Sequence, residues 1–277
     1  MKKHSSTILL LLVFLAGLSL LLYPTFSDWW NSLHQSQAVA GYAQQVSDMD
    51  DDTYEQMWAD AWDYNASLLS RTNALTLTNQ QKSQYNRMLN LGSNSVMGYI
   101  EIPKIGMTLP IYHGTDEAVL QVAVGHLEWT SLPVGGESSH CVVSGHRGLP
   151  SAKLFTNLDK LQTGDTFQMC VLDEVLTYEV DQIRIVEPHQ TDDLRIVEGE
   201  DLCTLVTCTP YGINSHRLLV RGHRVENAVK TTIRVTSDAM QIEPMLVAPV
   251  VALPMLLLLL IFMLRPKRSH NKYGGDD

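Results

Sequence analysis

The chain has 277 residues and a formal net charge of −10, from 20 Lys and Arg against 30 Asp and Glu. This length allows one large domain or two small ones with a sizeable core. The acidic balance argues against a nucleic-acid binder, because an acidic chain repels phosphate, and 4 cysteines argue against a disulfide-dense mini-protein. The charged fraction of 18% is below the usual value of about 25%, which predicts that apolar residues gather somewhere.

The first such place is an apolar run from Ile8 to Tyr23, preceded by Lys2 and Lys3. With its flanking residues the run is long enough to cross a bilayer. We therefore predict a cytoplasmic tail and an uncleaved transmembrane signal-anchor over residues 1–26. The alternative is a cleaved signal peptide with an A-x-A-like site at residues 38–40, which lies farther from the apolar run than is usual.

The second apolar run, Met245–Leu264, has 20 residues without a charge and is followed by a basic tail at 265–277. Basic residues flank both runs on their outer sides, so the positive-inside rule predicts that both termini are cytoplasmic and that the part between the runs is extracellular. The tails hold six of the 20 basic and two of the 30 acidic residues. The extracellular part therefore keeps 14 basic and 28 acidic residues, a net charge of −14.

Residues 27–95 are predicted to be mainly helical. Apolar and aromatic residues recur there at helical spacing after an acidic start at Asp50–Asp52, and a second helix is expected at Gln80–Leu91. We expect this stripe to face a core: Tyr54, Met57, Trp58, Ala61, Trp62 and Leu69.

Residues 96–235 change to short strands separated by Gly, Pro and Asp, which is typical of a sandwich or barrel. Helical pieces are expected at Asp116–Val124 and Ser151–Leu158, and residues 236–244 form a linker. The expected strands are Gly98–Ile102, Thr108–Tyr112, His140–Ser144, Thr166–Val171, Leu176–Val186, Leu202–Thr207 and Arg217–Val225.

The four cysteines fall into two groups. Cys141, Cys170 and Cys203 lie inside apolar strand patterns and are expected in the core, although a Cys141–Cys170 or a Cys170–Cys203 disulfide stays open. Cys208 instead ends a strand before a turn, and Arg217 begins the next strand. In an antiparallel hairpin the two face each other, and the guanidinium can favour a thiolate or donate to an oxyanion.

A nucleophilic thiol also needs an acid–base partner. His146 follows a strand and lies between glycines in Ser144-Gly-His-Arg-Gly148, so we expect its ring on an exposed turn, where it can protonate a leaving amine. A solvated loop histidine without a catalytic role is the alternative. Histidine and cysteine spacings typical of metal sites are missing from the sequence, and we predict neither a metal nor a cofactor.

These motifs closely resemble the sortase family, in order and at compatible spacing over about residues 96–225. The similarity is greatest to the class C, pilin-polymerising sortases, and the second apolar run fits that class. The stretches that carry it are Gly98–Gly106, Gly125–Gly136, Ser144–Phe155 and Thr204–Gly222.

The resemblance implies that Cys208 is the nucleophile, His146 the general acid and base, and Arg217 the oxyanion-stabilising or substrate-positioning residue. Thr207, beside the nucleophile, is a candidate substrate contact. The implied fold is mainly β: a closed eight-stranded barrel over 96–235 with peripheral helices, a helical segment before it, and a transmembrane helix at each end.

The family's reaction begins when the thiolate attacks the Thr carbonyl of an L-P-x-T-G-like signal, and an amine then takes the acyl group. In class C that amine is commonly a Lys of another pilin subunit. The implied partners are therefore pilins or surface proteins with such a signal. Attachment of surface proteins to a cell-wall amine, a hydrolytic membrane cysteine protease and an inactive assembly scaffold are the alternatives.

The sequence departs from class C at the lid that covers the site in many members. The segment Arg71–Asn79, where the lid is expected, has no Asp-Pro-aromatic motif. Either the lid is absent, or Leu75 or Leu77 plugs the cleft through apolar contacts alone.

Overall fold

The computed structural model describes residues 2–71, 75–92 and 96–227. The expected linker at 236–244, second span at 245–264 and basic tail at 265–277 lie outside the described residues, as do residues 72–74 of the expected lid segment.

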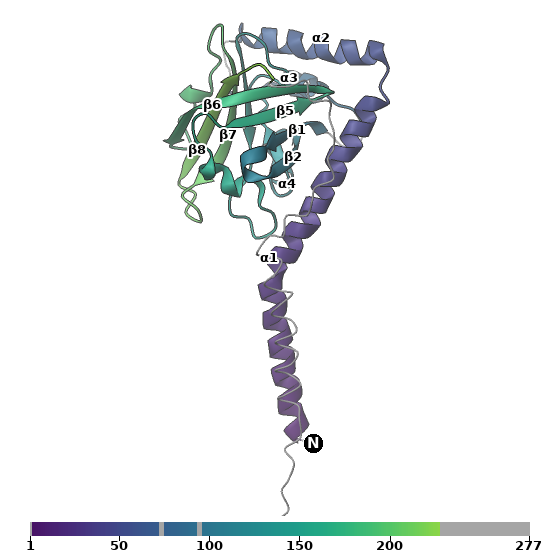
Figure 1. Ribbon diagram of the computed structural model, residues 1–277, viewed down its shortest axis with the longest axis vertical. Coiled ribbons are helices and arrows are strands. Elements are labelled where there is room, and N and C mark those ends of the chain that lie inside the picture. The colour runs from purple at the N-terminus through teal and green to yellow at the C-terminus, as the bar shows by residue number, and fades with distance from the viewer. Residues whose placement is uncertain (1, 72–74, 93–95, 228–277) are drawn as a thin grey trace, which may run out of the picture. The chain divides into compact units, whose positions relative to one another are not determined.

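Eight strands close into a single barrel, which confirms the mainly β fold (Figure 1). Their order around the barrel is β1-β2-β3-β4-β7-β8-β6-β5. The pairs β2–β3 and β4–β7 are parallel and the others are antiparallel. The strands are β1 (Val96–Ile102), β2 (Met107–His113), β3 (Val124–His126), β4 (Ser139–Ser144), β5 (Thr166–Val171), β6 (Glu174–Val186), β7 (Asp201–Thr209) and β8 (His216–Arg224).

The seven expected strands are confirmed with small changes at their ends, but β3 was missed. Its first residue, Val124, is the last residue of the expected helix Asp116–Val124, which is only α4 (Glu117–Leu120) in the structure. Three residues are too few to show an alternating pattern, and β3 is held by parallel pairing with β2 rather than by a local signal. The expected helix Ser151–Leu158 is the 3₁₀ helix η2 (Leu154–Lys160).

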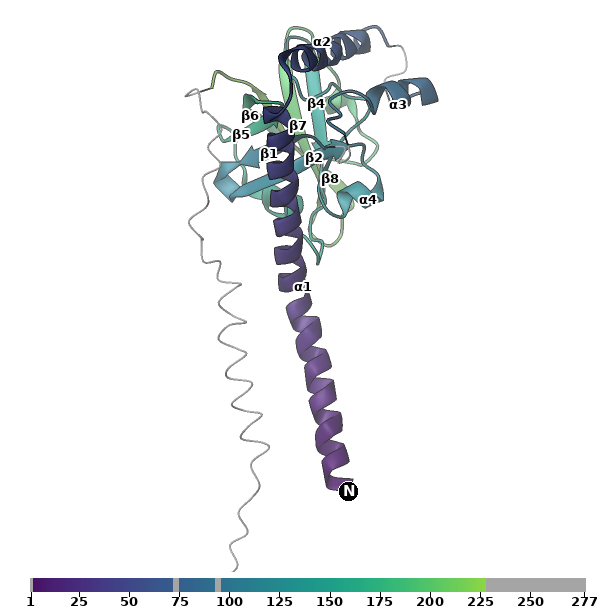
Figure 2. The ribbon, with the colours of Figure 1, turned by 90° about the vertical axis from the view of Figure 1, so that its right-hand side faces the viewer.

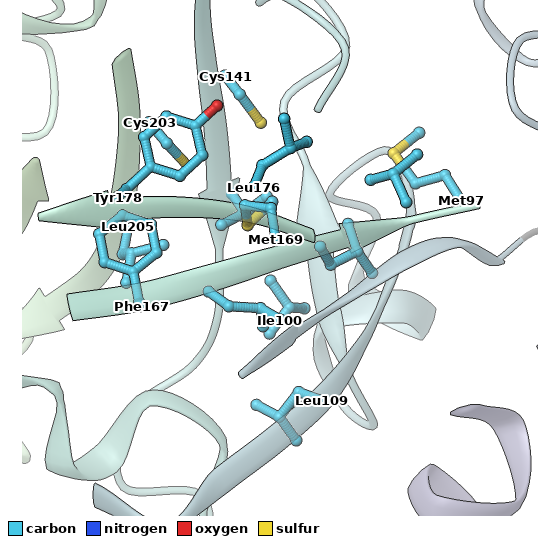
Figure 3. Close-up of a cluster of buried hydrophobic side chains, with 14 of the residues drawn as sticks. Met97, Ile100, Leu109, Cys141, Phe167, Met169, Leu176, Tyr178, Cys203 and Leu205 are labelled. Atoms are coloured by element: carbon cyan, nitrogen blue, oxygen red, sulfur yellow. The ribbon is translucent and has the colours of Figure 1, made fainter. Parts of the chain in front are cut away.

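The barrel interior holds the main core. Phe167 and Tyr178 stack there with ring centroids 5.6 Å apart, and Cys141 and Cys203 lie beside them (Figure 3). Burying such a side chain stabilises the fold by roughly 1.5–3 kcal/mol. A smaller cluster lies on the other face of β4, β7 and β8: Val142, Leu194, Val206 and Leu219.

Two shorter helices lie between the long helix α1 (Lys2–Ser47) and the barrel strands. Helix α2 (Asp51–Leu68) is capped by Asp50, which accepts a hydrogen bond from the Thr53 backbone N–H, and it lies across one end of the barrel (Figures 1 and 2). Helix α3 (Asn79–Tyr85) starts with a reciprocal Thr78–Gln81 capping box and is shorter than the expected Gln80–Leu91.

The expected aromatic stripe of α2 is only partly correct. Tyr54, Met57 and Trp58 pack against the core and Ala61 is buried, but the Trp62 side chain is 56% exposed and Leu69 is exposed as well. The buried face follows the spacing Ala61, Tyr64, Asn65 and Leu68. Trp62 lies one residue, and therefore about 100° around the helix, away from that face.

Helix α1 (Lys2–Ser47) is continuous through Pro24 and contains, from Leu9 onward, an apolar stretch long enough to cross a membrane. Its C-terminal part contacts the barrel domain. The Tyr42 hydroxyl accepts a hydrogen bond from the Leu172 backbone N–H at 2.6 Å and donates to the Met97 carbonyl at 3.2 Å. Asp28 accepts a bond from the Lys153 backbone N–H, so both sides of the alternative cleavage site at 38–40 are anchored to the folded domain.

Candidate active site

The hairpin of β7 and β8 places Cys208 directly opposite Arg217, as predicted. Residues directly opposite each other in an antiparallel pair have their side chains on the same face. Nη1 of Arg217 donates to the carbonyls of Asn214 and His216, at 3.3 and 3.1 Å. The loop therefore holds one end of the guanidinium, and these two bonds do not use its Nη2 and Nε groups.

The parallel pair β4–β7 brings the third residue to the same place. The strands are in register from Ser139 opposite Asp201 to Ser144 opposite Val206. Two further bonds extend the pairing: the Gly145 N–H donates to the Val206 carbonyl at 3.1 Å, and the Thr207 hydroxyl donates to the Gly145 carbonyl at 2.8 Å. Continuing this register by one residue places His146 level with Cys208.

The alternation of side chains along β7 and β8 places Cys208 and Arg217 on the same face. Cys203, Leu205 and Leu218 belong to the interior core, whereas Val206 and Leu219 belong to the outer cluster. Cys208 is two residues from Val206, and Arg217 is two residues from Leu219, so both lie on the outer face. His146 follows β4 by two residues, and the Gly145 bonds to Val206 and Thr207 hold its loop beside the end of β7.

The backbone around His146 is fixed by its neighbours. A side chain at Gly145 would come within 2.9 Å of the Phe155 ring, so this position needs glycine. The Phe155 N–H donates to the His146 carbonyl at 3.1 Å. Gly148, with φ of 77°, lies against the Tyr211 ring, which would meet any Cβ at 2.9 Å. The loop that carries His146 is thereby packed against both η2 and the β7–β8 loop.

A carboxylate lies on the other side of His146. Oε2 of Glu117, in α4, is 4.0 Å from Nε2 of His146, and the Glu117 side chain is 73% exposed. Gln121 donates a hydrogen bond to the other carboxylate oxygen. No motif of the sequence pointed to Glu117, because α4 meets His146 only through the fold.

Comparison with known proteins agrees with this geometry. A family model for the sortase domain matches residues 100–225. The chain is 51% identical to the crystal structure of sortase C1 from Streptococcus agalactiae, with a TM-score of 0.67, over 69% of this chain and 99% of that chain. The chain belongs to the sortase family.

Two further relatives support the assignment. The sortase is 45% identical to the crystal structure of Streptococcus pneumoniae sortase C, with a TM-score of 0.63, over 70% of this chain and 100% of that one. It is also 32% identical to sortase D of Bacillus subtilis (strain 168) over 131 residues, which are 46% of this chain and 63% of that relative. Sortases are cysteine transpeptidases, and the solved structures to which this one is similar are class C members.

Thr207 does not offer its side chain to a substrate in this sortase. The side chain is 1% exposed, and its hydroxyl is bonded to the Gly145 carbonyl. Thr207 points to the interior because it lies one residue from the outward Cys208. The geometry therefore supports a positioning role, in which Thr207 ties the end of β7 to the loop of His146.

The two lid candidates lie apart from the three catalytic candidates. Leu75 is 53% exposed and lines a groove with Trp129, His140 and Leu194, toward the N-terminal end of β4. Leu77 is half-buried against the main core. The lining of that groove, within the described residues, does not include Cys208, so plugging of the catalytic cleft by either leucine stays a prediction.

The other three cysteines are buried, as expected, and all four are free thiols. Burial raises the pKa of Cys170 to about 12 and that of Cys203 above its ordinary value. Cys141 lies directly opposite Cys203 in the β4–β7 register. Burial raises its pKa too, but hydrogen bonds from Cys203 and His126 outweigh that effect and lower it to about 6. Neither disulfide left open by the sequence forms.

Proposed function

We propose that this sortase is a membrane-anchored transpeptidase that polymerises pilins. It would cleave an LPxTG-like signal between Thr and Gly and join the Thr carbonyl to a Lys amine of another pilin subunit. The observation that carries the proposal is the pairing of Cys208 with Arg217, together with the bonds of Gly145 that tie the loop of His146 to the end of β7. The similarity to sortase C of Streptococcus pneumoniae, whose structure gives insight into pilin substrate specificity, supports the pilin as substrate.

The first half of the reaction follows from the three side chains. The Cys208 thiolate attacks the Thr carbonyl carbon and forms a C–S bond, and the electron pair moves to the carbonyl oxygen. Arg217 donates to this oxyanion, a contribution worth about 10²–10³ in rate for a single donor. The C–N bond to Gly then breaks while His146 gives a proton to the leaving amine. A thioester on Cys208 remains.

The second half restores the enzyme. His146, now neutral, accepts a proton from the acceptor amine as its nitrogen attacks the thioester carbon. The C–S bond breaks, its electron pair returns to the sulfur, and an amide to the lysine side chain is released. Transfer to an amine rather than to water is the property that separates this proposal from a hydrolytic protease.

The proposed membrane arrangement has two spans. The apolar part of α1 supports the first span, and the contacts of Asp28 and Tyr42 with the barrel domain support an uncleaved anchor. The proposed second span at 245–264 and the cytoplasmic position of both termini rest on the sequence pattern alone.

The test uses the full chain in detergent or vesicles with a pilin that has an LPxTG-like signal and a second pilin that supplies the acceptor lysine. A covalent, SDS-resistant pilin ladder is expected with the wild type and not with Cys208→Ala. Attachment of surface proteins to a cell-wall peptide amine without a ladder would favour the housekeeping activity. Cleavage whose rate ignores added amine would favour hydrolysis.

A further inference from the structure

Four side chains at the site follow one another around the barrel, from a carboxylate at one end to a guanidinium at the other. Helix α4 leads into β3, and the strands then follow as β3, β4, β7 and β8 around the barrel. Glu117 comes before this row, His146 follows β4, and Cys208 and Arg217 are paired on β7 and β8. The thiol and imidazole therefore lie between a carboxylate and a guanidinium.

The two charges suit different parts of the reaction. The guanidinium side stabilises the oxyanion, so the base must work from the opposite side of the carbonyl. The acceptor is a lysine amine with an ordinary pKa of about 10.4, and it arrives as a cation that must give up a proton before it attacks. A cation is repelled by Arg217 and attracted by Glu117.

We propose that Glu117 binds the ammonium group of the acceptor lysine and presents it to His146. The proposal rests on the transpeptidase function above and names the group that selects a charged amine as acceptor. Glu117 is exposed, so an incoming side chain can reach it. Its orientation is fixed by the Gln121 bond to Oε1, while Oε2 faces the imidazole.

The proton balance of the step is simple. The ammonium binds to the carboxylate and transfers one proton to neutral His146, and the free amine attacks the thioester on Cys208. The C–S bond breaks as the C–N bond forms, the sulfur leaves as the thiolate, and the second proton of the amine nitrogen leaves to solvent water. Glu117 keeps its charge throughout. Its contribution to acceptor binding therefore depends on the charge of the acceptor and not on how nucleophilic the acceptor nitrogen is.

The test compares a charged with a neutral nucleophile. The full chain is incubated with an LPxTG-type peptide and either Nα-acetyl-lysine amide or hydroxylamine, which is uncharged at pH 7.5. The variants are Glu117→Gln and the control Asp116→Asn, which removes the neighbouring exposed carboxylate. For Glu117→Gln we expect the KM of the lysine derivative to rise about threefold to fivefold, the scale of an exposed ion pair, with hydroxylamine unchanged.

Three results would overturn the inference. One is an equal loss with both nucleophiles, which would mean that Glu117 acts on His146 alone. The others are an unchanged KM in Glu117→Gln and an equal effect of Asp116→Asn. Hydroxamate formation by the wild type tests the transpeptidase separately. If it fails, the proposed function fails and the role of Glu117 falls with it.

Discussion

Strands β4 and β7 each have a cysteine within the barrel wall, Cys141 and Cys203. Each also leads to a second residue of thiol or imidazole chemistry, because His146 follows β4 and Cys208 lies near the end of β7. Cys141 and Cys203 face each other in mid-strand, with His126 against Cys141. Cys208 lies five residues after Cys203 on β7, and His146 follows the last residue of β4 by two positions. An odd spacing in a strand reverses the face, so Cys203 points into the core and Cys208 points outward.

The two positions differ in the access that they give to a substrate. The pKa of Cys141 is lowered to about 6, yet its side chain is only 2% exposed and no substrate carbonyl can reach it. Cys208 is half-exposed at the end of its strand, opposite a guanidinium. The proposed nucleophile is therefore the cysteine that a substrate can reach.

The largest expected effect comes from removing each thiol in turn. Cys208→Ala should lower the rate of amide formation by at least about 10³-fold, since the covalent route is lost. Cys203→Ala should leave the rate within about threefold and instead lower the unfolding free energy by about 1 kcal/mol through the lost burial. Peptide transfer rates and urea unfolding of both variants check this. Comparable activity losses in the two would contradict the comparison.

Arg217 should matter for activity in a way that the other arginines of β8 do not. Arg217→Ala should cost about 10²–10³ in kcat, because an oxyanion donor is removed. Arg221→Ala is the matched control on the same strand and face, where the side chain forms an ion pair with Asp181. It should change the rate by less than about threefold. Single-turnover kinetics of thioester formation measure both.

Gly145 tests how tightly the His146 loop must be held. In Gly145→Ala the new methyl group would meet the Phe155 ring at 2.9 Å, so we expect a loss of about 1–3 kcal/mol in stability and about 10²-fold in rate from the displaced imidazole. Gly41→Ala is the control, since an added methyl group there meets no atom within 4 Å. Normal activity in Gly145→Ala would show that the packing of this loop is unimportant.

The smallest effect concerns stability at high pH. Cys170 keeps its proton in the folded chain up to about pH 12, while a cysteine in the unfolded chain loses it near pH 8.5. The raised pKa therefore contributes stability that is present below about pH 8.5 and is lost as the pH rises toward 12. The unfolding free energy of the wild type should fall by about 1.4 kcal/mol per pH unit more steeply than that of Cys170→Ala. Equal slopes in urea titrations at pH 9 and 10 would refute this.

The sequence was sufficient for features with a local signal. Alternation located seven strands, and turn residues located the exposed ends that carry Cys208 and His146. Features created by contacts between distant segments had no such signal. The strand β3 is held by parallel pairing with β2. The exposure of Trp62 depends on which face α2 turns toward the barrel. Glu117 comes close to His146 only in the folded chain. The inward direction of the Thr207 side chain could have been inferred from the sequence, because Thr207 is the strand neighbour of the outward Cys208 and neighbouring side chains point to opposite faces.

The most direct test of the account is to identify the cysteine that carries the acyl group. The full-length wild type would be incubated with an LPxTG-type peptide in the absence of an amine, quenched in acid, digested and mapped by mass spectrometry. The account predicts a thioester ending in the Thr of the signal on Cys208 and unmodified Cys141, Cys170 and Cys203. An adduct on any of the three buried cysteines, or release of the Gly fragment with no adduct on Cys208, would contradict it.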